Sequence, residues 1–414
     1  MTRTVFTGAD VFDGTGSAPY RADVAVEDGR FAEVGTGLTG DETVDVTGRT
    51  LLPGLFDCHV HVLGVAPTVA ERLGEPFSFQ FYNAIPNLRR LLECGITTVR
   101  DCAGADLGVK QALRDGLIAG PRLQISITAI SQTGGHMDGA TPSGQWVDPY
   151  YLPHPGRPGS IADGVTGVRK AVRRSLRMGA DFVKVLATHS GRARYESTRF
   201  TVAELEAVAE EARAAGVAVA VHAYGPAAIK DAIRAGARSI EHIAYLDDEA
   251  IALMKESGTW LVPTVAMEMY ELPESEVTTP EAAREAIGHQ DDPGQDHVAA
   301  ARKALAELGR AHRAGIRIAM GTDFGNTAGD NLDELRAMTL AGLSPAEALV
   351  AATSSAAELL GLDDQLGTVT AGKRADLVVV DGDPYDFAAL KGAIESVYMD
   401  GGLVYRRSAR PVQG

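Results

Sequence analysis

Short apolar runs rich in β-branched residues alternate with amphipathic stretches from Leu55 to about Gly361. A run of four to eight apolar residues is typical of a buried strand, and an amphipathic stretch between two such runs is typical of a helix. The pattern therefore predicts repeated βα units around a parallel sheet. The eight strand candidates are Leu55 to Val62, Ile96 to Arg100, Arg122 to Ile127, Phe182 to Leu186, Val217 to His222, Ser239 to Ile243, Trp260 to Val265 and Ile316 to Met320.

The two ends of the chain show a different pattern, in which apolar and polar residues alternate. Residues 25–31 predict a hairpin closed by an Asp28-Gly29 turn, and residues 375–381 predict a strand near the other end. Two β-rich ends that flank a long α/β segment suggest one small sheet domain built from both termini. The predicted fold is α/β, a (β/α)8 TIM-like barrel over residues 57–364 with a small β-sandwich domain formed by residues 1–56 and 365–414.

Two long segments interrupt the predicted βα repeat. Ser131 to Ser160 follows the third strand candidate, and Ala266 to Asp296 follows the seventh. Loops after barrel strands lie on the catalytic face, so we expect both segments to cover the mouth of the barrel. Thr201 and Glu204 have the spacing of a capping box that opens a helix over Val202 to Ala215.

Composition narrows the class of protein and the kind of partner. The chain has 414 residues, 45% of them hydrophobic, which is enough for a substantial core. A formal net charge of −16 argues against broad binding to nucleic acid or anionic membranes, because a surface that follows phosphates is basic. No apolar run approaches the ~18 residues of a membrane span. We expect a cytoplasmic enzyme with a small-molecule substrate, assembled as a homo-oligomer.

Two features of the sequence carry little information about function. Cys58, Cys94 and Cys102 lack paired spacing, so we expect buried thiols rather than disulfides or a zinc ribbon. Gly35 to Gly40 satisfies the dinucleotide-binding fingerprint, but an extended segment follows it where a helix N-terminus would have to bind the pyrophosphate. We interpret this segment as a surface turn.

Candidate chemistry lies at the ends of the predicted strands. His59-Val60-His61 ends the first one, and residues i and i+2 of a strand share a face, so both imidazoles can reach one metal ion. An ordinary core histidine pair is the alternative for this triplet alone. Four later strand candidates end in or near Lys184, His222, His242 and Asp323. Metal-binding side chains at successive strand tips are what a barrel active site requires.

These residues, taken in order, resemble the amidohydrolase superfamily, and within it the prolidase-like branch of metal-dependent dipeptidases related to imidazolonepropionases. The resemblance spans nearly the whole chain, and the ordered set of motifs is highly specific. The matching segments are Pro53 to His61, Lys184, His222 to Gly225, Glu241-His242, Gly321 to Asp323 and Gly372 to Leu377.

The resemblance implies a centre of two divalent metal ions. The implied ligands are His59, His61, Lys184, His222, His242 and Asp323. Zinc is favoured because imidazole and carboxylate suit it, while manganese, cobalt and iron stay open. The family's lysine is a carbamate that bridges the ions, and an ammonium buried beside two cations would lose its proton. A barrel lysine held in a salt bridge is the alternative for Lys184.

The resemblance also implies the mechanism, in which a hydroxide bridging the two ions attacks a carbonyl that they polarise. Asp323 would act as general base and then as general acid; its alternative role is that of a helix N-cap. Tyr224 and His136 are candidates for catalysis and substrate binding, as donors to the developing oxyanion. The other histidines are expected to be structural or exposed: His154, His189, His289, His297 and His312.

One segment departs from the family pattern. Thr188 to Tyr195 follows Lys184 where a small glycine-rich turn is expected. Arg192 or Arg194 could bind a substrate carboxylate through two parallel hydrogen bonds, although exposed arginines are more often solvated. Substrates that carry a carboxylate are therefore a hypothesis from this segment.

The sequence predicts a binuclear metal-dependent hydrolase that cleaves an amide C–N bond, in dipeptides or N-acyl amino acids. One alternative is a mononuclear enzyme that opens a cyclic amide or deaminates a ring, as imidazolonepropionases and deaminases do. Ester or carbamate hydrolysis and a catalytically silent binding protein are the others. Lys184 discriminates between the first two hypotheses, because only a binuclear centre requires it.

Overall fold

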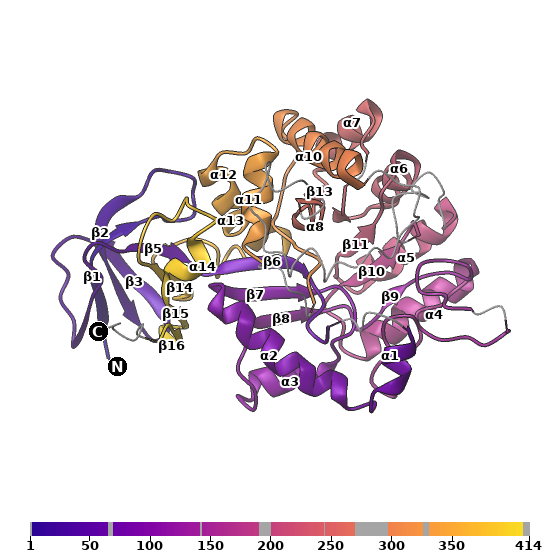
Figure 1. Ribbon diagram of the computed structural model, residues 1–414, viewed down its shortest axis with the longest axis horizontal. Helices are drawn as coiled ribbons and strands as arrows, with labels where there is room; N and C mark the ends of the chain where they lie inside the picture. Colours follow the sequence, from indigo (N-terminus) through magenta and orange to yellow (C-terminus); the bar gives the residue numbers. More distant parts are fainter. Residues whose placement is uncertain are drawn as a thin grey trace.

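The computed structural model describes residues 2–64, 69–140, 143–189, 200–243, 245–269, 297–325 and 331–408. Figure 1 shows a mixed β-sheet at one end of the molecule, beside a larger region in which helices surround short strands. The described N-terminal and C-terminal segments both lie at the sheet end. Among the described residues, no helix combines the length and the apolar character needed to cross a bilayer.

The small sheet joins the two ends of the chain. Its strands are β1 (Thr4–Val11), β2 (Tyr20–Glu27), β3 (Arg30–Gly35), β4 (Glu42–Asp45), β5 (Thr50–Pro53), β14 (Leu377–Val380), β15 (Ile394–Met399) and β16 (Gly402–Arg406). Their order is β16-β15-β14-β5-β1-β2-β3, with β4 also paired to β1. The β2–β3 hairpin turns at Asp28 and Gly29, whose φ values of +49° and +73° are those of a tight hairpin turn. The predicted hairpin is confirmed.

Apolar side chains on one face of this sheet form their own core. Phe6, Val24, Leu51, Leu377 and Val379 are buried together. The alternation that predicted these strands follows from the pleat, which sends successive side chains to opposite faces.

The larger region contains two parallel sheets. The first consists of β6 (Leu55–Val60), β7 (Ile96–Asp101) and β8 (Arg122–Ile125). The second consists of β9 (Ala129–Ile130), β10 (Val183–Leu186), β11 (Val219–His222), β12 (Ser239–Glu241) and β13 (Trp260–Val262), in the order β13-β12-β11-β10-β9. β6 to β8 and β10 to β13 match seven of the predicted strands, and the short β9 was not predicted.

Helices follow these strands in the alternating order that the sequence predicted. The capping box at Thr201 opens α5 as expected. The longer helices are α2 (Phe79–Glu93), α3 (Leu107–Arg114), α4 (Gly164–Arg177), α5 (Val202–Ala214), α6 (Pro226–Ala235), α7 (Asp248–Ser257), α10 (His297–Arg313) and α11 (Asp333–Leu340). The shorter ones are α1 (Val69–Gly74), α8 (Ala266–Met269), α12 (Pro345–Ala351), α13 (Ser354–Leu359) and α14 (Leu390–Ala393).

The predicted eighth strand, Ile316 to Met320, is wrong as a regular strand. Its backbone makes two hydrogen bonds to β13 and one to β6: Leu261 N donates to Arg317 O over 2.9 Å, Ala319 N donates to Leu261 O over 3.0 Å, and Cys58 N donates to Met320 O over 2.9 Å. Met320 N donates instead to Ala351 O beside α12, so no ladder propagates along the segment. Among the described residues, the parallel strands therefore form two sheets and not one closed eight-stranded sheet.

In the larger region, four described non-glycine residues near the carboxyl ends of strand segments have left-handed backbone. They are Ile127, His242, Thr264 and Asp323, with φ values of +69°, +73°, +51° and +62°. Side-chain sterics disfavour this conformation, which therefore concentrates where surrounding structure enforces it, often at functional sites. These residues stop the ladder early, which is why β8, β12 and β13 end before the predicted limits.

Candidate metal centre

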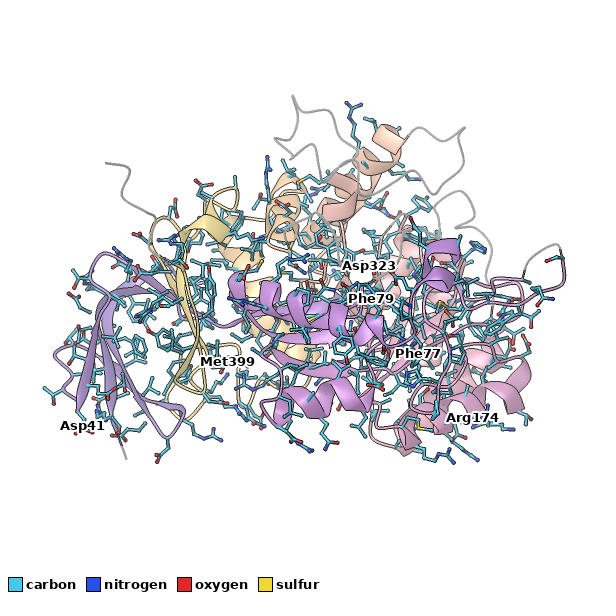
Figure 2. All side chains as sticks on the ribbon, turned by 60° about the horizontal axis from the view of Figure 1, so that its bottom comes forward. Asp41, Phe77, Phe79, Arg174, Asp323 and Met399 are labelled. Atoms are coloured by element: carbon cyan, nitrogen blue, oxygen red, sulfur yellow. The ribbon has the colours of Figure 1, made fainter. Side chains whose placement is uncertain are left out.

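The structure brings all six predicted metal ligands together. His59 lies in β6, Lys184 in β10 and His222 at the end of β11, while His242 follows β12 directly. Asp323 Oδ1 is 3.3 Å from His59 Nε2 and 3.0 Å from His61 Nε2. The rings of His222 and His242 are 4.5 Å apart between centroids. Figure 2 marks Asp323 in the larger region, away from Asp41 and Met399 of the small sheet.

Three of the histidines are oriented by a hydrogen bond at Nδ1. His59 Nδ1 donates to Glu241 Oε2 over 2.9 Å, and His61 Nδ1 donates to Ala103 O over 3.0 Å. Because a carboxylate and a carbonyl only accept, Nδ1 carries a proton in both rings, and Nε2 is the nitrogen that faces Asp323. His242 Nδ1 lies 2.8 Å from Thr264 Oγ1. Such outward hydrogen bonds are typical of metal-binding histidines.

His222 has the opposite orientation. Its Nε2 lies 3.3 Å from the carbonyl oxygen of His189, which leaves Nδ1 as the nitrogen with a lone pair. Burial and the neighbouring His242 ring lower the pKa of His222 well below its usual value, so the ring is neutral and able to bind a cation.

Lys184 is buried, with 2% of its surface exposed. Its Nζ lies 3.5 Å from His59 Nε2. Within the described part of the chain, Lys184 forms no ion pair with a carboxylate, which counts against the salt-bridge alternative. A buried ammonium with no anionic partner is unfavourable.

Among the described residues, two groups of side chains have donor atoms close enough to hold a metal ion. In each group, the donor atoms lie within 4.8 Å of one another. One group is His59, His242 and Asp323, and the other is His59, Cys102 and Glu241. The first combines imidazoles with a carboxylate at the mouth of the strands, and this donor set suits zinc.

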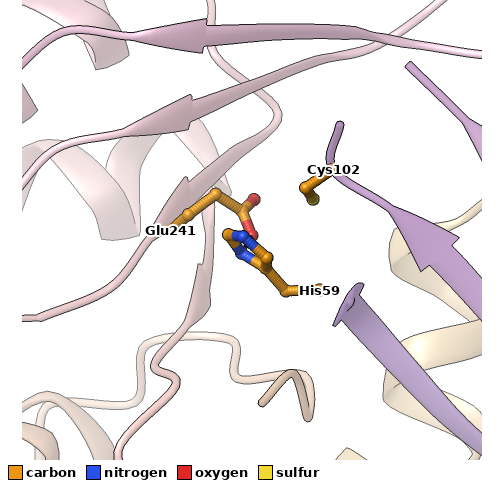
Figure 3. Close-up of side chains that lie close together, drawn as sticks. All are labelled: His59, Cys102 and Glu241. Carbon is orange, nitrogen blue, oxygen red and sulfur yellow. Dashed lines mark hydrogen bonds and ion pairs between the residues drawn. The ribbon is translucent and has the colours of Figure 1, made fainter. Parts of the chain in front are cut away.

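The second group is better explained as support for His59. Figure 3 shows the His59 ring beside the Glu241 carboxylate, with Cys102 nearby. Glu241 also accepts a 2.7 Å hydrogen bond from Arg100 Nη2, so a cation is already present there. Burial alone would raise the pKa of Glu241, but Arg100 and the hydrogen bond from His59 lower it below the usual value. Glu241 is thus a charged acceptor that fixes the His59 ring.

Tyr224 and His136, the predicted oxyanion donors, lie beside the cluster. The Tyr224 ring stacks on His242 at 5.1 Å between centroids, and the His136 ring is 4.8 Å from that of His222. His136 Nε2 is 3.2 Å from Tyr150 Oη, while its buried Nδ1 has no hydrogen-bond partner in the described part of the chain. Burial lowers the pKa of His136 to about 3, so the ring is neutral.

The two long loops are described to different extents. Ser131 to Ser160 carries His136 and also Tyr151, whose ring lies 6.1 Å from that of His61, so this loop borders the cluster as predicted. Of Ala266 to Asp296, only the beginning is described. Arg192 and Arg194, the predicted carboxylate-binding residues, lie outside the described residues.

Sequence reasoning missed several residues at the site. His189 was expected to be structural or exposed. Its backbone carbonyl oxygen lies next to His222 Nε2 and orients that ring. Asp57, Arg100 and Glu241 are fully or almost fully buried charged residues beneath the cluster. A usable signal was present for Asp57, because it shares the i, i+2 spacing of His59 and His61. A charged residue inside an apolar run was the signal for Arg100.

Comparison with known proteins confirms the resemblance read from the motifs. The model of the amidohydrolase family matches residues 50–404. An ochratoxinase from Aspergillus niger is 33% identical over 360 residues, covering 81% of this chain and 71% of that protein. An imidazolonepropionase from Methylobacterium sp. (strain 4-46) is 29% identical over 398 residues, covering 86% of this chain and 87% of that protein.

Solved structures also resemble this one. The crystal structure of a Xaa-Pro dipeptidase with bound methionine in the active site superimposes with a TM-score of 0.82 at 29% identity. The match covers 98% of this chain and 100% of the other. Together, the family match and this likeness imply a TIM-barrel-like α/β fold with a β-sandwich domain.

Proposed function

The chain belongs to the amidohydrolase family, whose members include hydrolases, and on that basis we propose that it is a binuclear metal-dependent enzyme that cleaves an amide C–N bond. The proposed substrates are dipeptides or N-acyl amino acids. The observation that carries the proposal is the position of Lys184, buried 3.5 Å from His59 Nε2 within a cage of histidines and Asp323.

The proposed centre takes two divalent ions, with zinc favoured by the donor set. Asp323 with His59 and His61 forms one side of the cage, and His222 with His242 forms the other. Lys184, as a carbamate made from its neutral amine and carbon dioxide, would place an anion between the two sides. That modification would remove the unfavourable buried ammonium.

The metal pair, when bound, would lower the pKa of water and polarise the substrate carbonyl. Asp323 accepts the proton of the attacking water and returns it to the departing amine, since its carboxylate is next to both strand-one histidines. His136 and Tyr224 border the same space and are the proposed donors to the carbonyl oxygen as it gains charge. We propose Arg192 and Arg194 as the residues that bind a substrate carboxylate.

Metal analysis joined to a substrate screen tests this function. Purified protein should contain two transition-metal ions per chain and should hydrolyse members of a library of dipeptides and N-acyl amino acids. Lys184→Ala should lose one ion and most activity, while Lys170→Ala, on the outer helix α4, should behave like the wild type. Absence of turnover for every amide, ester and lactam would reject the proposal and favour a silent binding protein.

A mononuclear enzyme is the second candidate, and the imidazolonepropionase relative favours it. One tightly bound metal per chain, activity that is indifferent to Lys184→Ala, and turnover of a cyclic amide or a ring amine would establish that reading. An ester or carbamate hydrolase would use the same residues and would be recognised by turnover of esters or carbamates screened beside the library.

We also propose the domain division 1–56, 57–364 and 365–414, with the first and last segments in one domain. The antiparallel pairing of β5 with β14 supports it, because this ladder joins the two ends of the chain.

A further inference from the structure

Asp323 has an unusual backbone position for a residue with a central role. Its φ is +62°, and the segment before it belongs to no regular strand. A left-handed aspartate persists only when its surroundings hold it there. One direct backbone contact is a 2.8 Å hydrogen bond from Asp323 N to His59 O. The remaining support acts through the preceding residue, Thr322.

Asp57 is the acceptor at the centre of that support. Its Oδ1 accepts from the backbone N–H groups of His59 and Thr322, both over 3.1 Å. Its Oδ2 accepts from Thr322 Oγ1 over 2.7 Å and from Asn331 Nδ2 over 2.8 Å. Asp57 and Thr322 are fully buried, and Asn331 is 7% exposed. One carboxylate therefore binds both the strand that carries His59 and the residue that precedes Asp323.

The residue types suit this arrangement and leave little room for substitution. An ionised carboxylate only accepts, and all four groups that face Asp57 are donors. Thr322 Oγ1 in turn accepts from Phe324 N over 3.2 Å and from Asn331 Nδ2 over 3.1 Å. The network thus encloses Asp323 between two residues, Thr322 and Phe324, whose backbone groups are both fixed by side chains.

We infer that Asp57 is a positioning residue that sets the backbone conformation of Asp323, so that His59 and Asp323 keep the separation needed to hold one ion. In this segment, the hydrogen bonds from Thr322 to Asp57 hold the backbone in place, as a strand ladder does elsewhere in the sheet. The inference rests on the proposed role of Asp323, but the backbone geometry it predicts is independent of any substrate.

Two substitutions break the network at different points. Asp57→Asn keeps the shape but replaces one accepting oxygen with an amide nitrogen, a donor that faces other donors, and Thr322→Val keeps the volume but removes the hydroxyl. Zinc binding, measured by competition with a chromophoric chelator, should weaken by about 10- to 100-fold in both variants. The kcat on whichever substrate the screen finds should fall by a similar factor while KM changes little. Thr322→Ser, which retains the hydroxyl, should restore zinc affinity and kcat to near the wild-type values.

Asp376→Asn is the matched control. Asp376 is also a buried carboxylate, 3% exposed, and it pairs with Arg122 and accepts from Asp400 N away from the cluster. The control should lower the melting temperature but leave zinc affinity unchanged. A merely structural role for Asp57 would make Asp57→Asn behave in the same way, and that result would overturn the inference.

A crystal structure of Thr322→Val separates this inference from the proposed function. The inference expects residue 323 to leave the left-handed region, even if no amide substrate is ever found. If Thr322→Val keeps both the φ of residue 323 and the wild-type zinc affinity, the positioning role of Asp57 is refuted. The proposed hydrolysis by the wild type would not be affected by that result. Should Asp57→Asn fail to fold, the comparison of Thr322→Val with Thr322→Ser decides the question.

Discussion

The small sheet and the metal-cluster end of the larger region are held by different kinds of interaction. In the small sheet, ladders such as Leu377 to Val380 of β14 against Thr50 to Pro53 of β5 run in register over every residue. At the cluster, backbone ladders end, and side chains such as Asp57 and Glu241 hold the chain. Regular pairing gives a rigid frame, while side-chain acceptors let individual backbone groups leave strand geometry and aim ligands inward.

This contrast predicts that substitutions of the ligand side chains at the cluster change chemistry with little change in stability, and that substitutions in the sheet do the reverse. A change in the packing behind the cluster should affect both.

Asp323→Asn should reduce kcat by about 10²- to 10⁴-fold, the usual contribution of a general base. The free energy of unfolding should change little, since Asp323 is 28% exposed at its side chain and its backbone contact to His59 is retained. Steady-state kinetics and thermal melts on the same preparation measure the two effects. Wild-type turnover in this variant would remove Asp323 from the mechanism.

Leu377→Ala should lower the free energy of unfolding by about 2 to 5 kcal/mol, because it leaves a cavity in the core of the small sheet. Zinc affinity should not change. Urea denaturation provides the measurement, and Leu403→Ala, at a leucine 48% exposed on β16, is the control with little expected effect. A loss of zinc binding in folded Leu377→Ala would show that the two regions are not independent.

Gly321→Ala tests the close approach behind the cluster. A Cβ on Gly321 would lie 2.3 Å from Val262 Cγ1 and 2.9 Å from His59 Cβ. We expect about 1 to 3 kcal/mol of destabilisation from overpacking, together with weaker zinc binding because His59 must move. Gly392→Ala, where the added methyl group has open space, is the comparison. Equal behaviour of the two variants would contradict this description of the site.

Glu33→Gln should have the smallest effect. Glu33 accepts from Arg3 over 2.7 Å at the exposed edge of the small sheet, where water and salt screen the pair. Neither the urea midpoint nor zinc affinity should change measurably. A clear loss of stability that disappears at high salt would show that this edge depends on charge.

The sequence predicted the starts of strands better than their ends. Strands β6, β7 and β8 begin where the apolar runs begin, since burial decides the start of a strand. The ends depend on residues such as His242, which leaves the ladder by adopting φ of +73°. The pattern of apolar residues cannot predict this backbone conformation, because the conformation depends on contacts with distant parts of the chain.

The site likewise divides into residues that a sequence pattern identifies and residues that only the fold identifies. The six clustered residues were found because imidazoles, a lysine and a carboxylate at strand ends have a recognisable chemistry. Asp57 and Glu241 were not assigned a role, because their partners, Thr322 and Arg100, come from remote segments. Spacing along the chain identifies groups that share a strand, and only the fold shows which strands face each other.

The pairing of β5 with β14 has a consequence for biosynthesis. Pro53 lies opposite Leu377, so the ribosome must synthesise the whole intervening chain before this ladder can form. Until then β5 has an unsatisfied edge, which is prone to intermolecular association. Slow maturation and a need for chaperones during high-level expression follow from such non-local topology.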